Sequence, residues 1–174
     1  MKYMRLKHLR IDILNISQEE FISRIGKNTD YFGYISRFES GERKPSLGFL
    51  FGMVKNLGVQ PNWFFLGTGD YYFSYSEKIN FKEFQNIFQR IEILRTHIGV
   101  SIRGFVKIIG MPIDTFYCIK KAGFFSEKSK KFVYLENIIE LLGVSPNWLI
   151  LGIGEMFYDE YRTNIVIFNH LKSS

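Results

Sequence analysis

Apolar residues recur three and four positions apart along most of the chain, and this spacing predicts short helices that pack around a core. The apolar side of the first helix is formed by Leu6, Leu9, Ile13 and Leu14. No segment alternates convincingly between apolar and polar residues. The one β-like run, Asn164 to Phe168, is equally compatible with a helix or a partner-binding segment. The pattern therefore predicts an all-α fold.

Capping and breaking residues divide the rest of the N-terminal half into four more helices. Ser17 and Glu20 form a capping box, in which the Ser17 hydroxyl accepts from the Glu20 backbone N–H and the Glu20 carboxylate reaches back. A third helix is expected from Thr29 or Asp30 to about Phe38. The residues expected to end one helix or begin the next are Gly26, Gly41, Pro45, Ser46, Gly58, Pro61 and Gly67.

The chain contains an internal repeat. Leu57 to Asp70 recurs as Leu142 to Glu155 at an offset of 85, with Leu-Gly-Val-x-Pro-Asn-Trp in both copies, and Leu9-Arg10 recurs as Leu94-Arg95 at the same offset. Between these segments the matches, such as Ser17 with Ser101, lie at an offset of 84. One residue is therefore lost before the second helix of the repeat and regained after the third. We interpret the chain as a tandem duplication.

The repeat also gives the expected domain boundaries. We expect a first domain over residues 1–75, a second, diverged domain over 76–157 and a tail over 158–174. The segment from Glu77 to Ile98 has the pattern of one long helix that joins the copies and opens the second. Such a helix would hold the two domains semi-rigidly rather than on a flexible tether.

The motif of the first copy resembles that of a known family. Ser17-Gln18-Glu19-Glu20-Phe21-Ile22-Ser23-Arg24-Ile25-Gly26 and the segment from Tyr34 to Ser46 are similar to the Cro/phage-repressor (XRE-type) helix-turn-helix family, whose last helix the Pro-Asn-Trp ending also resembles. The resemblance covers about residues 5–70 closely and 88–156 more loosely. It implies two tandem five-helix lambda-repressor-like helix-turn-helix domains joined by a long helix. The first motif helix would lie across the DNA backbone and the second in the major groove.

The expected reading helix has a polar face and an apolar face. Phe32, Ile35 and Phe38 point inward, which leaves polar side chains to meet base edges. Arg37 is suited to guanine or a phosphate, and Tyr34 to a thymine methyl group or a phosphate. Asn28 is suited to adenine. The predicted DNA-binding residues are Gln18, Asn28, Thr29, Tyr31, Tyr34, Arg37, Arg43 and Lys44.

Three of these residues, and one acid, have roles at the edge of the motif. The resemblance implies a backbone contact for Gln18, next to the free N–H groups of a helix start, while Arg43 and Lys44 are suited to neutralise phosphates. The resemblance also implies that Glu39 pairs with an arginine of the first helix, for which Arg10 is the candidate. The turn between the motif helices is about three residues longer than is usual in the family, and this leaves the start of the reading helix open. Each of these charged residues, taken alone, is also compatible with an ordinary solvent-exposed surface. The prediction of DNA binding therefore depends on the order of all the motif residues along the chain.

The second copy keeps the apolar pattern and loses the polar one. Ile102, Gly104 and Gly123 stand where the first copy has Gln18, Glu20 and Glu39. Phe124 and Phe125 fit either a contact surface or a core. The basic residues, which fit nonspecific phosphate contacts or a solvated face, are Lys120, Lys121, Lys128, Lys130 and Lys131. We expect this copy to support the first, through a homodimer formed by the second domain or the tail, or through added backbone contacts.

The composition excludes several classes of protein and favours others. The net charge of +6 and a pI of about 9.3 favour an anionic partner. The single cysteine, Cys118, excludes an internal disulfide and a thiolate-rich zinc site. The three histidines show no ligand spacing, and no apolar run reaches the length of a membrane span. We therefore expect no metal, no cofactor, no membrane anchor and no enzyme, and we expect a cytoplasmic location because the basic N-terminal stretch has no apolar segment of a secretion signal.

These observations predict a sequence-specific, double-stranded DNA-binding transcriptional regulator, repressor-like, that reads the major groove with the helix around residues 29–38. The alternative is a protein–protein interaction module, an antitoxin or an anti-regulator, built on the same tandem scaffold. Salt-dependent DNA binding separates the two, because a module that binds only protein shows none.

Overall fold

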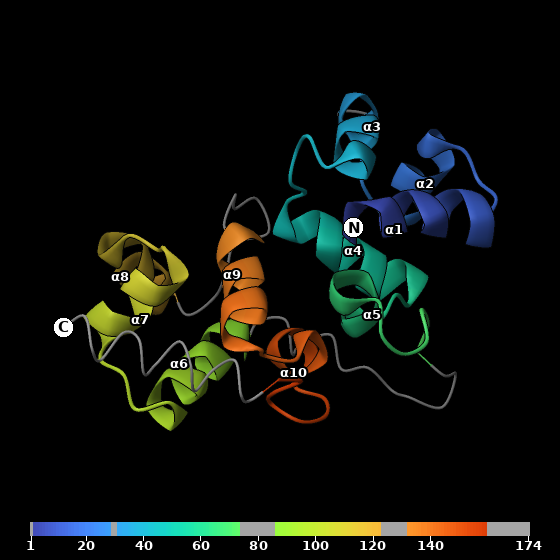
Figure 1. The fold of residues 1–174 in the computed structure, drawn as a ribbon. Helices are drawn as coiled ribbons and strands as arrows, with labels where there is room; N and C mark the ends of the chain where they lie inside the picture. Colours follow the sequence, from blue (N-terminus) through green and yellow to red (C-terminus); the bar gives the residue numbers. More distant parts are fainter. Residues whose placement is uncertain (1, 29–30, 74–85, 123–131, 160–174) are drawn as a thin grey trace. The chain divides into compact units, whose positions relative to one another are not determined.

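The computed structural model describes residues 2–28, 31–73, 86–122 and 132–159 (Figure 1). Every regular element in these ranges is helical, which confirms the predicted all-α class. The chain divides into two compact units, Met1–Lys78 with Glu127–Lys130, and Ile79–Ser126 with Lys131–Ser174. The parts of the expected joining helix over 77–85 and of the tail over 160–174 lie outside the described residues.

Each unit contains five α-helices within its described residues. Those of the first unit are α1 (Lys2–His8), α2 (Gln18–Arg24), α3 (Phe32–Ser40), α4 (Leu47–Leu57) and α5 (Pro61–Leu66), with the π-helix η1 (Leu9–Ile13) continuing α1. Those of the second unit are α6 (Ile87–His97), α7 (Ile102–Ile109), α8 (Ile113–Ala122), α9 (Phe132–Leu142) and α10 (Pro146–Leu151). In the first unit α1 packs against both α3 and α5, and α2 packs against α3.

The predicted caps and stops are confirmed for the later helices of the first unit. The Ser46 hydroxyl accepts from the Phe49 backbone N–H at 3.2 Å, and α4 begins at the next residue, as expected. It ends before Gly58, whose φ of +66° places it in the left-handed region. α5 begins at Pro61 and ends before Gly67, also left-handed, so local residue types set these boundaries.

The predicted start of the third helix lies outside the described residues. α3 starts at Phe32, its preceding residue Tyr31 makes no side-chain cap bond, and the expected caps Thr29 and Asp30 lie outside the described residues. In the second unit α8 already begins at Ile113, directly after Pro112. Proline fixes φ at a helical value and so favours a helix start, whereas the first unit has Asn28 at that repeat position. Asn28 therefore lies in the connection before α3 and not on the helix.

Aromatic rings form the centre of each unit. Phe49 of α4 is fully buried and lies edge-on to Phe38, with ring centroids 5.1 Å apart, and it also lies near Phe21. In the second unit Phe116 of α8 has the corresponding role and meets Phe88 at 5.3 Å. These rings seat α3 and α8 on the core, because each provides more buried apolar area than any aliphatic side chain.

The two units differ where the second helix meets the fourth. A Cβ atom on Gly52 of α4 would lie 2.4 Å from the backbone oxygen of Ile25, so only glycine fits this approach. At the matching position of the second unit Asn137 donates from Nδ2 to the oxygen of Ile109 at 2.8 Å. The first unit thus brings two helices close together, while the second links them through a side chain.

A short pairing closes each unit, and the sequence pattern did not indicate it. Val59 pairs with Tyr72 in an isolated antiparallel bridge, and Val144 pairs with Phe157 in the same way. Both pairs are separated by the repeat offset of 85, so the two copies share this contact as well as their helices.

Candidate nucleic-acid interface

The start of α2 is fixed by half of the predicted capping box. The Ser17 hydroxyl accepts from the backbone N–H of Glu20 at 3.1 Å. The Glu20 carboxylate does not return to Ser17 and instead accepts from Arg24 at 2.6 Å, one turn along the helix. Gln18, the first residue of α2, is therefore placed at a helix start whose remaining N–H groups are available to an anion.

A buried ion pair ties this helix start to α3. Arg10 donates from Nε to Glu39 Oε1 at 2.6 Å and from Nη2 to Oε2 at 3.1 Å, as the resemblance implied. Gln18 donates from Nε2 to the same carboxylate at 3.3 Å, and both charged residues are less than 10% exposed, at 9% for Arg10 and 6% for Glu39. Because a two-pronged arginine–carboxylate pair allows little angular freedom, it sets η1, α2 and α3 at fixed mutual positions.

The π-helix explains how Arg10 reaches this place despite its extra residue. The Leu14 N–H donates to the Leu9 oxygen, five residues back, at 2.9 Å, so this turn holds one more residue than an α-helical turn. As a result Arg10 donates from Nη1 to the Ile16 oxygen at 3.0 Å, and Arg95 makes the matching bond to Val100 at 2.9 Å. The change of offset from 85 to 84 is thus absorbed inside the helix.

The outer face of α3 is polar, small and exposed. Ile35, Phe38 and Glu39 are buried on the inner side. The exposed residues lie at helical spacing on the other side: Gly33, Ser36, Arg37 and Ser40. Short side chains at these positions let the backbone of a helix approach another molecule closely, and Arg37 is the one long side chain among them.

Arg37 is held only weakly. Its Nε lies 3.7 Å from Glu42 Oε1, and the two side chains are 53% and 68% exposed. A surface pair of this kind contributes at most about 1 kcal/mol and is screened by salt. Arg37 can therefore exchange Glu42 for a phosphate or a base edge at little cost.

The loop after α3 places a second arginine beside the helix. Gly41, at φ +78°, ends α3 and turns the chain, so that the Arg43 backbone N–H donates to the Arg37 oxygen at 3.0 Å. The Arg43 guanidinium lies over the ring of Tyr34, 4.0 Å from its centroid. This cation–π contact keeps Arg43 on the α3 side of the loop, and Lys44 follows as an exposed side chain.

The structure brings only some of the predicted contact residues together. Gln18, Tyr34, Arg37, Arg43 and Lys44 belong to α2, α3 and the following loop, and Thr29 lies outside the described residues. Tyr31 is turned inward, where its ring stacks on Phe49 at 6.4 Å and its hydroxyl lies 3.4 Å from Ser46 Oγ. Asn28 is exposed in the connection between α2 and α3. The candidate interface is therefore centred on the second half of α3 rather than on its start.

Each unit contains one arginine with a structural role that the sequence analysis did not predict. Arg5 donates from Nη1 to the oxygens of Phe64 and Phe65 at 2.8 and 3.0 Å, and Arg90 donates to those of Leu149 and Ile150 at 2.8 Å. Burial lowers the pKa of the Arg5 guanidinium from its ordinary value. Each arginine donates to backbone carbonyls near the end of a short helix, which have no partner within that helix. The two arginines are separated by the repeat offset of 85, and this match could have indicated a shared role.

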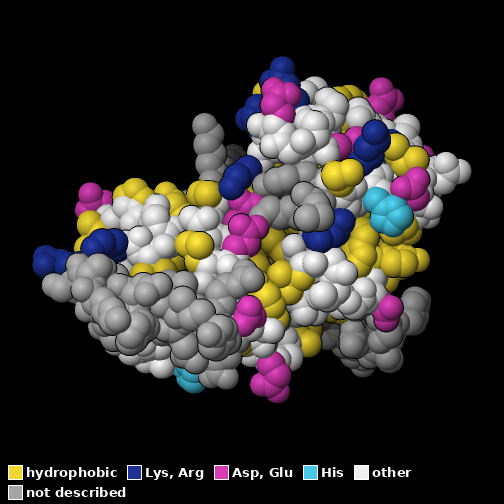
Figure 2. All heavy atoms as spheres, in the orientation of Figure 1, with side chains coloured by type: hydrophobic (Ala, Val, Ile, Leu, Met, Phe, Trp, Pro, Cys, Tyr) yellow, Lys and Arg dark blue, Asp and Glu magenta, His cyan; other side chains and the backbone are white. Residues whose placement is uncertain are grey.

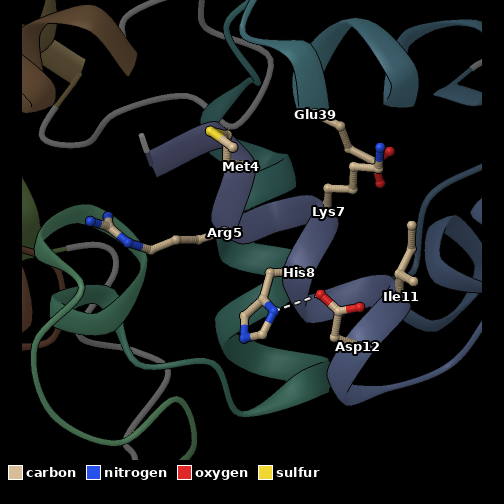
Figure 3. Close-up of a pocket in the computed structure, with 7 residues that line it drawn as sticks. All are labelled: Met4, Arg5, Lys7, His8, Ile11, Asp12 and Glu39. Atoms are coloured by element: carbon tan, nitrogen blue, oxygen red, sulfur yellow. Dashed lines mark hydrogen bonds and ion pairs between the residues drawn. The ribbon is translucent and has the colours of Figure 1, made fainter.

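A shallow hollow of about 390 Å³ runs along α1 and η1 and reaches Glu39 of α3 (Figure 3). Met4 and Ile11 provide its apolar surface and are exposed. His8 and Asp12 join across one helical turn at 2.7 Å, and the carboxylate of Glu39 lies at the other end. The hollow is therefore lined in part by Glu39, the acid of the buried pair with Arg10.

The histidines and acids of the described part of the chain do not gather into a metal site. No group of three or more His, Cys, Asp or Glu side chains there is arranged to hold a metal ion. His8 pairs with Asp12 and His97 lies near the ring of Phe157, while His170 is outside the described residues. None of the helices in the described ranges is long and apolar enough to cross a bilayer.

Comparison with known proteins adds no family to this description. No family model, no curated protein and no solved structure matches the chain. The interpretation of the α2–α3 pair therefore rests on its geometry and on the resemblance of its sequence motif.

Proposed function

We propose that the chain consists of two tandem lambda-repressor-like helix-turn-helix domains, and that the first binds double-stranded DNA sequence-specifically as a repressor-like transcriptional regulator. In this proposal α2 lies along the phosphate backbone and α3 enters the major groove. The chain acts by occupancy and performs no chemistry.

The observation that carries the proposal is the exposed outer face of α3. Its small polar residues surround Arg37, and Arg43 stands beside it on the ring of Tyr34. An arginine at this place suits the two acceptors of guanine or a phosphate oxygen. The buried pair of Arg10 and Glu39 supports the same reading, because it neutralises an acid that would otherwise repel phosphates.

The first test is a selection of random duplexes followed by sequencing. We expect one enriched site, and if the protein binds as a symmetric dimer, two half-sites about 34 Å apart, one helical turn. An unenriched pool would overturn sequence-specific binding. It would favour the alternative, a protein–protein interaction module, which shows neither a preferred site nor salt-dependent DNA affinity.

The second test is Arg37→Ala on the selected duplex, measured by fluorescence anisotropy in the presence of competitor DNA. We expect a loss of about 1–3 kcal/mol, because one base-reading contact disappears. Lys55→Ala is the matched control, since Lys55 is an exposed cation in the last turn of α4. Equal losses for the two variants would mean that Arg37 contributes only general charge.

A further inference from the structure

Four cations lie exposed on α7 and α8 of the second unit. Arg103 and Lys107 stand one turn apart on α7, and Lys120 and Lys121 are adjacent in the last turn of α8. Tyr117, which is 50% exposed, lies one turn before these lysines on the same side of α8. Figure 2 shows Lys or Arg side chains, with an acidic side chain nearby, at the end of the second unit that α7 and α8 form.

None of these four cations forms an ion pair or hydrogen bond with any residue that the structure describes. Asp114, in the first turn of α8, is the one acid within α7 and α8, and a negative charge there complements the helix dipole. An unpaired group of exposed cations raises the local positive potential and costs the fold self-repulsion. The arrangement therefore suits an anionic partner.

The same positions in the first unit carry a different charge pattern. Glu19 and Glu20 stand where the second unit has Arg103 and Gly104, and Ser36 stands where it has Lys120. The arginines of the first unit are engaged, Arg24 with Glu20, Arg37 with Glu42 and Arg43 with the Tyr34 ring. The second unit has therefore gained positive charge on its α7–α8 pair relative to the α2–α3 pair.

The second unit has also lost polar side chains that the first unit has at its candidate interface. Ile102, Pro112 and Cys118 stand at the repeat positions of Gln18, Asn28 and Tyr34, and Lys121 stands at that of Arg37. None of the first three replacements offers the paired donors and acceptors that distinguish one base pair from another. Lys121 keeps a cation at the Arg37 position but lacks the planar fork of a guanidinium, and its compact ammonium group suits phosphates.

We propose that the α7–α8 face of the second unit binds the phosphate backbone of the same duplex that the first unit reads, without sequence preference of its own. This inference rests on the proposed function of the first unit. Binding of this kind is driven by the release of counterions from DNA. It raises affinity for every sequence equally and leaves the choice of site to α3.

The test is a variant of the full chain with Arg103→Gln, Lys107→Gln, Lys120→Gln and Lys121→Gln. Glutamine is a good helix former and these positions are exposed, so the fold is retained and helicity checks this. Affinity is measured by anisotropy over a range of salt concentrations, on the selected duplex and on a mixed-sequence duplex. Lys7→Gln with Lys55→Gln, two exposed cations of α1 and α4, is the control for net charge.

We expect the slope of log affinity against log salt to become shallower by about 0.9 for each phosphate that the variant no longer neutralises, and so by about 2 to 4 in all. The ratio of affinities for the two duplexes is expected to stay the same. An unchanged slope, a fallen ratio, or an equal change per charge in the control would each overturn the inference.

The outcomes also separate this inference from the proposed function. If the slope is unchanged in the variant while Arg37→Ala still weakens the selected duplex, the inference alone fails. If the chain binds all duplexes alike and the variant loses that binding, the backbone contact stands and sequence-specific reading fails. If the unaltered chain binds no duplex, both fail.

Discussion

In the first unit the Arg10 guanidinium binds Glu39, an acid in the last turn of another helix, α3. In the second unit Arg95 binds Glu92, an acid on its own helix, α6. The sequences of the two copies account for this change of partner. Glu92 of the second copy stands at the position of Lys7, and Gly123 stands at the position of Glu39. In the second unit Arg95 Nε and Glu92 Oε1 are buried and make no hydrogen bond to any described residue. The second arginine is neutralised, but less completely.

The comparison shows that the position of the acid decides what the arginine does. An acid from another helix makes the guanidinium a link between helices, while an acid three residues away on the same helix makes it a local pair. In the first unit this link fixes α3 against η1 and α2. The described part of the second unit has no such link to α8, in agreement with our proposal that α8 does not read bases.

The largest expected effect is on the buried pair. Glu39→Gln leaves the Arg10 charge buried without its acid, and we expect a loss of about 3 kcal/mol in the free energy of unfolding of the first unit. Glu92→Gln removes the acid from a partly exposed pair, 17% and 25%, joined by one hydrogen bond, and we expect a smaller loss of about 1–2 kcal/mol in the second unit. Each unit has one tryptophan, Trp63 or Trp148, so urea unfolding followed in Trp→Phe backgrounds reports on the units separately.

The matched control for this prediction is Glu42→Gln. Glu42 is an exposed acid two residues after α3, so its removal is expected to change stability by less than about 0.5 kcal/mol. Equal losses for Glu39→Gln and Glu92→Gln would contradict the comparison. It would mean that the origin of the acid does not matter.

A medium effect is expected where α2 meets α4. Gly52→Ala places a Cβ atom 2.4 Å from a backbone oxygen, so the helices must separate, and we expect a loss of about 1–3 kcal/mol in the first unit. Gly33→Ala is the control, because no atom lies within 4 Å of its Cβ position and alanine favours a helix. The same unfolding measurement checks both. A neutral Gly52→Ala would show that the first unit tolerates the wider spacing of the second.

The smallest expected effect is on the stacked arginine. Tyr34→Leu removes the ring below Arg43, and we expect about 0.5–1 kcal/mol weaker binding to the selected duplex. Tyr34→Phe keeps a ring and is expected to retain most of that affinity. If the two variants bind alike, the stack does not position Arg43.

The elements of the fold could be predicted from local residue types. Ser17, Ser46 and Pro61 begin helices and Gly41 and Gly58 end them, because caps and left-handed glycines act through the neighbouring backbone. The predicted start of α3 at Thr29 or Asp30 stays a prediction, because these two residues lie outside the described ones. The structure describes a 3₁₀ turn at Tyr31 and α3 from Phe32.

The long-range contacts could not be predicted in the same way. Arg5 and Arg90 reach carbonyls 59 and 60 residues away, and periodicity carries no information about such targets. The π-helix is a comparable case. The sequence showed one extra residue between Arg10 and Ser17. Whether the helix or the following loop takes up this residue depends on the relative free energies of the two arrangements, which the sequence pattern does not give. Arg37 was placed correctly on an exposed face, since burial of Ile35 and Phe38 fixes the rotation of α3.

The exposed thiol of Cys118 makes the second unit easy to follow. It is the only cysteine in the sequence, and it lies on α8 beside Tyr117 and close to Lys120 and Lys121. A maleimide dye or a photoactivated crosslinker would therefore attach at one known point of the unaltered chain. Placed there, energy transfer to a labelled duplex would report directly how near α8 comes to the helix axis of the DNA.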